Sequence, residues 1–370
     1  TVYVRRLWKL VGPQPKKIDV PVAMLTAIGM HPRAGVQAEV VEGLLAIVAG
    51  KRVAKRRWSP HEQSHALTAL ARLEIQGVDT LLMRILKRSS ASPEVRRAAY
   101  LAVGRRAGVV EPQKRAQLAQ AVARALDRRR DPLTTGLGLI AAGRLLGADL
   151  AEKKLGVLDK TRIPKALFAA AEQGVAGERG FGTLALALAA QGAASSGHAL
   201  PFLARTKNLM VKGLKEGRGD DTIRAAYAVG LGLLKVQDSV NELLEVVRDD
   251  GALPILRGHA AVALGQIARE KKEVRSALRR LLQSRRDMLL RVRTALALAM
   301  LGDNEVRDQL LDELKSAGSE YHRSHVVIAL GRLGDLRTIR ELVAYAQDEK
   351  NTELARALAV VAMGLIVDPE

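Results

Sequence analysis

The chain has 370 residues, no cysteine and ten aromatic residues, while 48% of its residues are hydrophobic. The absence of cysteine excludes a disulfide framework and a thiolate metal site, and the few aromatic rings argue against stacking on single-stranded nucleic acid. The net charge is +20, and residues 1–130 hold 25 Lys and Arg against 9 Asp and Glu, whereas residues 241–370 hold 20 of each. This asymmetry predicts an anionic partner at one end of the chain.

Four regions follow one another along the chain. Residues 1–20 contain Pro13, Pro15, Trp8 and five basic residues, which predicts a basic N-terminal arm in an extended conformation. Residues 21–130 are predicted to form basic helical repeats, residues 131–218 irregular apolar repeats and residues 219–370 regular repeats. Small and apolar residues recur at three- and four-residue steps, as one buried helix face requires. No stretch of useful length alternates as a strand would, so we predict an all-α protein.

A small residue recurs late in every second predicted helix and defines ten register positions. Their spacing of 32 to 46 residues is typical of a repeat architecture. Gly or Ala at this place would let a neighbouring helix approach closely. The register residues are Gly29, Ala71, Gly104, Gly143, Ala189, Gly232, Gly265, Ala299, Gly331 and Gly364.

An arginine stands eight residues before the register residue in several repeats. In the C-terminal half its spacing is 32 to 34 residues, and this half is electrically neutral. We therefore interpret these arginines as a structural ladder that ties one repeat to the next. The alternative is a row of guanidinium groups for acidic ligands. The ladder residues are Arg96, Arg224, Arg257, Arg291, Arg323 and Arg356.

These residues resemble the HEAT-repeat family, in particular its short, phycobilisome-lyase-like form, which reads roughly Val-Arg-x-x-Ala-x-x-Ala-Leu-Gly-x-x-Gly-Asp. The match is close over residues 222–368 and 93–108, and poor over residues 131–192, where Thr135 and Phe181 replace the arginine. The resemblance implies an armadillo-type, right-handed α-solenoid of about ten stacked helix pairs whose second helices line a concave side. It is specific for fold and unspecific for function.

Two basic clusters are the candidate partner-binding surface. Charge alone would carry the contact, so a protein or peptide, acidic in character, is the leading partner. A nucleic-acid backbone, bound with a steep salt dependence, is the alternative. The alternative without a binding role is that both clusters are solvated loops between helices. The residues are Lys51, Arg52, Lys55, Arg56, Arg57 and Trp58, together with Arg105, Arg106, Arg128, Arg129 and Arg130.

His61, Glu62 and His65 match the His-Glu-x-x-His pattern of zinc hydrolases, which places two imidazoles on one helix face beside a general base. Ser59, Pro60 and Glu62 also form a helix start with a capping box. No third ligand follows at the usual distance. We therefore predict no metal and no cofactor, and keep a metal-dependent enzyme at this segment as an alternative.

His65, His259 and His325 each lie six residues before a register residue. HEAT-like di-iron hydroxylases, which the chain resembles in fold, use several His-Glu pairs. Packed helices lie about 8–10 Å apart, however, so these three histidines are too far apart to share one metal. We interpret them as half-buried helix residues.

The centre and the C-terminal end are apolar. Residues 134–143 and 181–190 predict helices buried on both sides, either as a thicker core or as a groove for a partner helix or peptide. Polar residues interrupt residues 180–204, which argues against a membrane span. An apolar helix predicted at residues 354–366 needs a cover, either from a partner or from further chain.

The sequence thus predicts a non-catalytic scaffold or adaptor that binds a macromolecular partner through the solenoid surface. One alternative is a HEAT-like protein that binds nucleic acid, or one that also acts on it as the HEAT-like DNA glycosylases do. The composition fits both a cytoplasmic protein and one exported after removal of a leader, and it fixes no oligomeric state.

Overall fold

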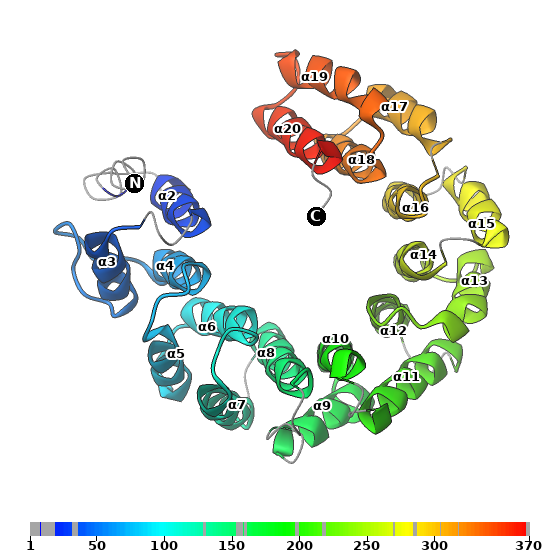
Figure 1. Ribbon diagram of the computed structural model, residues 1–370. Coiled ribbons are helices and arrows are strands. Elements are labelled where there is room, and N and C mark those ends of the chain that lie inside the picture. Colours follow the sequence, from blue (N-terminus) through cyan, green and yellow to red (C-terminus); the bar gives the residue numbers. More distant parts are fainter. Residues whose placement is uncertain are drawn as a thin grey trace. The chain divides into compact units, whose positions relative to one another are not determined.

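The computed structural model describes residues 8, 19–31, 36–128, 131–152, 158, 161–196, 200–216, 220–268, 271–283, 287–303, 305–316 and 318–367. These residues form nineteen α-helices, α2 to α20, with two short 3-10 helices and one isolated bridge between Val53 and Arg56 (Figure 1). Successive helices pack in pairs, and the pairs stack on one another. The prediction of an all-α solenoid is confirmed.

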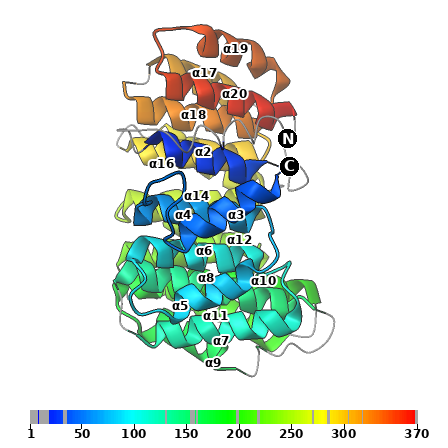
Figure 2. The same cartoon turned by 90° about the vertical axis from the view of Figure 1, so that its left-hand side faces the viewer.

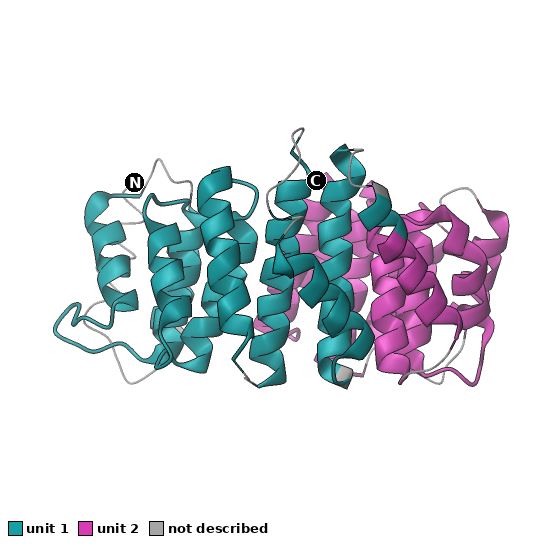
Figure 3. Cartoon of the chain, turned by 90° about the horizontal axis from the view of Figure 1, so that it is seen from below, with its two compact units in different colours: residues 1–204 teal, residues 205–370 magenta. Residues whose placement is uncertain are grey.

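The chain divides into two compact units, residues 1–204 and 205–370 (Figure 3). The boundary lies inside helix α11 (Leu200–Lys215). The four regions proposed from the sequence stay a prediction. Of the predicted N-terminal arm, the structure describes Trp8 and the start of the first described helix, and the rest lies outside the described residues.

Unit 1 is built from two helix layers that stack in chain order (Figure 2). Each even-numbered helix packs on the next even-numbered helix, and the odd-numbered helices cover one side of that layer. The even-numbered layer consists of α2 (Asp19–Met30), α4 (Pro60–Arg72), α6 (Pro93–Arg106), α8 (Pro132–Leu150) and α10 (Ala176–Ser196). The odd-numbered layer consists of α3 (Ala38–Val48), α5 (Val78–Lys87), α7 (Pro112–Leu126) and α9 (Arg162–Gln173).

Unit 2 repeats the same arrangement. Its even-numbered layer consists of α12 (Asp221–Leu233), α14 (Pro254–Ile267), α16 (Met288–Met300), α18 (Glu320–Leu333) and α20 (Glu353–Val367). The other layer consists of α13 (Val240–Arg248), α15 (Lys272–Leu282), α17 (Val306–Ser316) and α19 (Ile339–Gln347), with the 3-10 helices η2 (Gln237–Ser239) and η3 (Leu336–Thr338) before α13 and α19.

All ten predicted register residues lie in the even-numbered helices, and close helix contact explains their small size. A Cβ added to Gly29 would lie 2.7 Å from the Cα of Ala69 on α4, and one added to Gly331 would lie 2.8 Å from the Cα of Ala362 on α20. Both separations are too short for real atoms, so only glycine allows these helices to approach so closely. Gly364, on the last helix, has nothing within 4 Å of the added atom.

Three even-numbered helices of unit 1, α4, α6 and α8, begin in the same way. Ser59, Ser92 and Asp131 each accept a hydrogen bond from the backbone three residues later, and each is followed by a proline at the first helical position. A capping side chain satisfies a free backbone N–H, and proline has no N–H to leave unsatisfied. These caps and prolines fix the residue at which α4, α6 and α8 each begin.

Helices α8 and α10 are the apolar centre of unit 1. Added Cβ atoms on Gly143 and Gly192 would overlap the backbones of Ala185 and Gly147, so the two helices are in direct contact. Among the described helices, α8 alone is long and apolar enough to cross a membrane, and 67% of its most apolar window is buried inside the structure. Such burial is typical of a core helix.

Candidate binding surface

The recurring arginines contact the ends of the helices that precede them. Arg224 and Arg257 each donate from Nε and Nη2 to one carbonyl, that of Leu214 and Val247, at 2.9–3.2 Å. Arg356 donates from Nε to the carbonyl of Ala346 at 2.7 Å. Carbonyls in the last turn of a helix have no partner within the helix and lie at its negative end. The guanidinium groups therefore act as caps in unit 2.

Arg96 and Arg291 make related contacts, and Arg323 differs. Arg96 is 1% exposed and donates to the carbonyls of Leu86, Arg88 and Ser89. Arg291 donates to the carbonyl of Leu282 and to the carboxylate of Glu313. Among the described residues, no such carbonyl contact is found for Arg323, the next arginine of the series. These contacts support the structural interpretation of the ladder.

Three residues of the predicted basic surface serve the fold instead. Trp58 is 4% exposed, and the guanidinium of Arg56 stacks over its ring at 3.8 Å while forming an ion pair with Glu62. Arg106 is 6% exposed and donates two hydrogen bonds, of 2.6 and 2.9 Å, to the carboxylate of Asp79. Their contacts within unit 1 remove these three residues from the candidate surface. Arg129 and Arg130 lie outside the described residues.

The other described residues of the predicted basic surface lie on two opposite edges of the even-numbered layer of unit 1. At one edge the chain enters α4, α6 and α8, and Arg128 donates to the carbonyl of Lys87 at 3.3 Å, which joins two neighbouring loops. All the side chains there are exposed, and none forms an ion pair with an acid among the described residues. This entry-edge cluster consists of Lys51, Arg52, Lys55, Arg57, Lys87, Arg88 and Arg128.

The other edge, where the chain leaves α4 and α6 and where residue 144 of α8 packs beside α6, carries a row of three arginines. Arg72, Arg105 and Arg144 lie on α4, α6 and α8, and each directly follows a register residue. None of them has an ion pair with a described acid. We call them the exit-edge row. Since α4 has 13 residues, about 20 Å separates the two edges at 1.5 Å per residue.

Of this row, only Arg105 belongs to the basic clusters predicted from the sequence. Arg72 and Arg144 stand alone in the sequence, and a search for runs of basic residues overlooks them. The repeat register does find them, because all three occupy the position after the small residue. Arg105 and Arg106, adjacent in sequence, conversely have different environments, one exposed and one buried.

An apolar strip lies on the same layer of helices. Leu101 on α6 is 52% exposed and Leu133 on α8 is 46% exposed. Leu137 and Ile140, also on α8, are half-buried. Exposed leucines between basic edges are typical of a surface that contacts an amphipathic partner.

The histidine motif does not assemble a metal site among the described residues. The rings of His61 and His65 lie 4.9 Å apart. Both carboxylate oxygens of Glu62 are engaged, one with Arg56 and the other with Ser59 in the capping box. Burial opposes ionisation of Glu62, but the bonds from Ser59 and Arg56 outweigh it and lower its pKa. No group of three His, Cys, Asp or Glu side chains in the described ranges could hold a metal ion.

The other histidines of that repeat position are separate. His259 lies on α14 and His325 on α18, with α16 packed between these two helices. Burial, with a smaller effect of Arg293, lowers the pKa of His259 to about 4. His259 is therefore neutral at pH 7. His65 is half-buried on α4, where burial and His61 lower its pKa.

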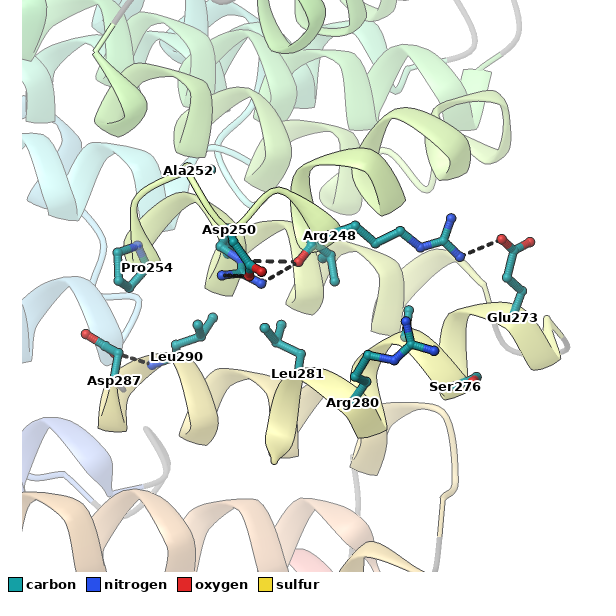
Figure 4. A pocket seen from close by; sticks show the side chains of 13 residues that line it. Arg248, Asp250, Ala252, Pro254, Glu273, Ser276, Arg280, Leu281, Asp287 and Leu290 are labelled. Atoms are coloured by element: carbon teal, nitrogen blue, oxygen red, sulfur yellow. Dashed lines mark hydrogen bonds and ion pairs between the residues drawn. The ribbon is translucent and has the colours of Figure 1, made fainter. Parts of the chain in front are cut away.

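Unit 2 contains a cavity of about 660 Å³ formed by α13, α14, α15 and α16 (Figure 4). Arg248 pairs with Glu273 at 2.6 Å, and Arg257 pairs with Asp250 at 2.9 Å. Asp287 caps the start of α16. Most charges at this cavity therefore neutralise one another, unlike those at the edges of unit 1.

Comparison with known proteins supports the fold and gives no further identity. No family model matches the chain, and no curated protein matches it. The structure of Kap121p aligns with a TM-score of 0.50 and 12% identity, over 99% of this chain and 44% of that protein. YibA of E. coli gives 0.44 and 16%, over 85% of this chain and 99% of that one. Human deoxyhypusine hydroxylase gives 0.32 and 18%, over 81% and 96%.

At these identities the likeness to Kap121p concerns the fold alone, and this chain spans less than half of that protein's length. The broad resemblance to HEAT-like helical repeats is confirmed. The narrower link to the phycobilisome-lyase form has no support from a family model. A shared solenoid does not imply a shared function, so the function must be argued from the surface.

Proposed function

We propose that this protein is a scaffold that binds an acidic protein or peptide through the even-numbered helix layer of unit 1. One observation carries the proposal. Basic side chains without described acidic partners line both edges of this layer, and exposed leucines lie on the same layer. The proposal agrees with the function predicted from the sequence and narrows the surface to fewer residues.

The charge of unit 1 supports an acidic partner. Residues 1–204 contain 32 Lys and Arg against 15 Asp and Glu, whereas residues 205–370 contain 27 against 24. Buried arginines of unit 1 such as Arg96 and Arg106 donate to carbonyls or carboxylates within the unit. The exposed excess at the edges is therefore available to attract an anion and to accelerate its association.

The surface fits a polypeptide better than a nucleic acid. An amphipathic acidic segment would bury Leu101 and Leu133 while its carboxylates meet the basic edges. A sugar-phosphate backbone would use the charges and leave both leucines exposed. With ten aromatic residues in the whole chain, base stacking adds little to nucleic-acid binding.

Catalysis is not part of the proposal. The candidate general base, Glu62, is held in a capping box and an ion pair. A general base in zinc hydrolysis must instead reach a metal-bound water. The metal-dependent alternative therefore gains no support from the geometry around His61 and His65.

Binding of a labelled probe tests the proposal. The probe is a synthetic 15-residue peptide of alternating Glu and Leu pairs, with fluorescence anisotropy as the measurement. Changing four entry-edge residues (Lys51, Arg52, Lys55, Arg57) to Glu should weaken binding by about tenfold or more, since several exposed charge contacts are worth a few tenths of a kcal/mol each.

A matched variant of unit 2 supplies the control. Glu substitutions at four exposed basic residues there change the net charge equally and should leave affinity within about twofold. Absence of peptide binding, or equal losses in both variants, would overturn the proposal. Tighter binding of a 20-base-pair DNA duplex, lost in the entry-edge variant, would favour the nucleic-acid alternative. The control positions are Lys272, Arg280, Arg332 and Arg340.

A further inference from the structure

We propose that the exit-edge row binds an extended acidic segment with a carboxylate at every third residue. The inference rests on the proposed function and adds a sequence rule for the partner. Arg72, Arg105 and Arg144 would each receive one carboxylate. The segment would run across α4 and α6 at the ends where the chain leaves them, and then across α8 at Arg144.

The regular position of the three arginines sets the spacing. They occupy the same register position on successive helices of one layer. Packed helices lie about 8–10 Å apart. A polyproline II segment rises about 3.1 Å per residue with three residues per turn. Residues i, i+3 and i+6 therefore project from one side about 9 Å apart, which matches the helix spacing.

A cavity gives this edge a defined shape. Arg72 and Arg105 both line a cavity of about 520 Å³ formed at the ends of α2, α4 and α6. Met30, which is 71% exposed, and the buried Leu73 add apolar surface to its lining. The cavity can therefore receive a side chain between the first two arginines of the row.

The third arginine is linked to the second through Gly104. A Cβ added at Gly104 would lie 3.0 Å from Cδ of Arg144, so the stem of this side chain reaches back from α8 onto α6. Gly104 directly precedes Arg105. This contact places Arg144 next to Arg105, so the three arginines form one continuous row.

Carboxylates are the ligands that these groups favour. A guanidinium offers paired N–H donors that fit a carboxylate in a bidentate manner. Three neighbouring cations without described acidic partners repel one another, and bound carboxylates would relieve this repulsion. No Phe, Tyr or Trp is among the described residues that line the cavity, so stacking of bases has no platform there.

Glu74 provides an internal check on the site. It is the one acid among the described lining residues, and it lies in a left-handed backbone conformation, with φ of 52°, just after α4. Its carboxylate carries the same charge as the proposed ligand. Glu74→Gln should therefore strengthen binding of an acidic segment by about two- to fivefold, the size of an exposed charge interaction.

Two peptides of identical composition test the spacing rule. Both are 12-residue peptides of Pro, Ala and four Glu, with Glu at every third position in one and four adjacent Glu in the other. The wild-type protein should bind the spaced peptide at least fivefold more tightly. Changing Arg72, Arg105 and Arg144 together to Ala should abolish this preference, whereas Arg332→Ala on α18 should preserve it.

The outcomes separate this inference from the proposed function. Equal affinity for both peptides, or a preference that survives the triple substitution, would refute the spacing rule even if acidic peptides still bind. Failure of both peptides and of the Glu-Leu probe to bind would refute both proposals. Tighter binding of a 12-base single-stranded oligonucleotide than of the spaced peptide would also overturn the inference. Melting curves of each variant check that the fold is retained.

Discussion

The two units share one architecture but use their arginines differently. In unit 2, Arg224, Arg257 and Arg356 recur regularly, and each caps the end of the preceding helix. In unit 1 the series is irregular, and basic residues exceed acidic ones by 17, against 3 in unit 2. Arginines within the repeat pattern thus support the helices, while the surplus of basic over acidic residues lies mainly in unit 1.

Helix stacking does not account for this excess. Arg96 and Arg106 already supply the buried contacts of their repeat in unit 1. At both edges, basic residues without acidic partners among the described residues outnumber acids, and their mutual repulsion adds no stability. The proposed binding role gives these residues a function that helix packing does not. We therefore expect the two units to differ in function although their helices pack in the same way.

The largest effect on stability should come from breaking the buried Asp79–Arg106 ion pair of unit 1. The more exposed pair Asp303–Arg279 of unit 2 serves as its comparison. Asp79→Ala leaves Arg106, 7% exposed at its side chain, without its carboxylate and should lower the free energy of unfolding by about 3–5 kcal/mol. Asp303→Ala in unit 2 leaves Arg279, which is 41% exposed and still paired with Glu305 at 2.7 Å. Its effect should be about 1 kcal/mol.

Urea denaturation of both aspartate variants measures this difference. The units need not unfold together, so the transition of each unit should be followed separately. A loss at Asp303→Ala as large as that at Asp79→Ala would contradict the assignment of greater burial to the pair in unit 1.

A pH effect is expected at His259 in unit 2. The pKa of His259 is lowered to about 4, mainly by burial and then by Arg293. Above about pH 6.5, the ordinary value, the side chain is neutral in both folded and unfolded chains. As the pH falls from 6.5 to 4, only the unfolded chain gains the proton, so stability decreases by at most about 3 kcal/mol.

His259→Gln should remove this part of the pH dependence. The thermal stability of the variant, measured between pH 7 and pH 4, should fall less steeply than that of the wild type. His325→Gln, which changes the same residue type at the same repeat position on α18, is the control. Parallel curves for the wild type and His259→Gln would refute the prediction.

Register glycines should behave alike in both units. Gly143→Ala in unit 1 and Gly331→Ala in unit 2 place a Cβ against the backbone of the next helix. Each should lower stability by about 2 kcal/mol, as overpacking does. Gly364→Ala, which meets nothing within 4 Å, should instead raise stability by up to about 1 kcal/mol. Thermal denaturation measures these changes. A loss of stability at all three positions would show that the register glycines are not explained by helix packing.

The period of the sequence was sufficient to predict the fold. All ten register residues lie in even-numbered helices, because close packing of successive helices demands a small residue at one place in each repeat. The start of α4 was also predictable, since Ser59, Pro60 and Glu62 form the expected capping box. Both features depend on local spacing, which the sequence displays directly.

The binding surface was less predictable, because exposure depends on contacts between distant residues. Asp79 lies 27 residues before Arg106 and neutralises it, and no local pattern indicates this pairing. The cluster at residues 51–57 divides similarly, with Arg56 held by Trp58 and Glu62 while its neighbours stay exposed. Arg72 and Arg144 form a row only once α4 and α8 stand beside α6.

The smallest predicted effect separates supporting arginines from binding arginines. Arg257 donates from two nitrogens to the carbonyl of Val247 and pairs with Asp250. Lysine keeps the charge but cannot reproduce this planar geometry, so Arg257→Lys should lower stability by about 1 kcal/mol and leave peptide affinity unchanged. Arg72→Lys should leave stability unchanged and weaken the spaced peptide about two- to threefold, because a bidentate contact is lost while the charge remains. If both variants changed the same property, the distinction between the arginines of the two units would fail.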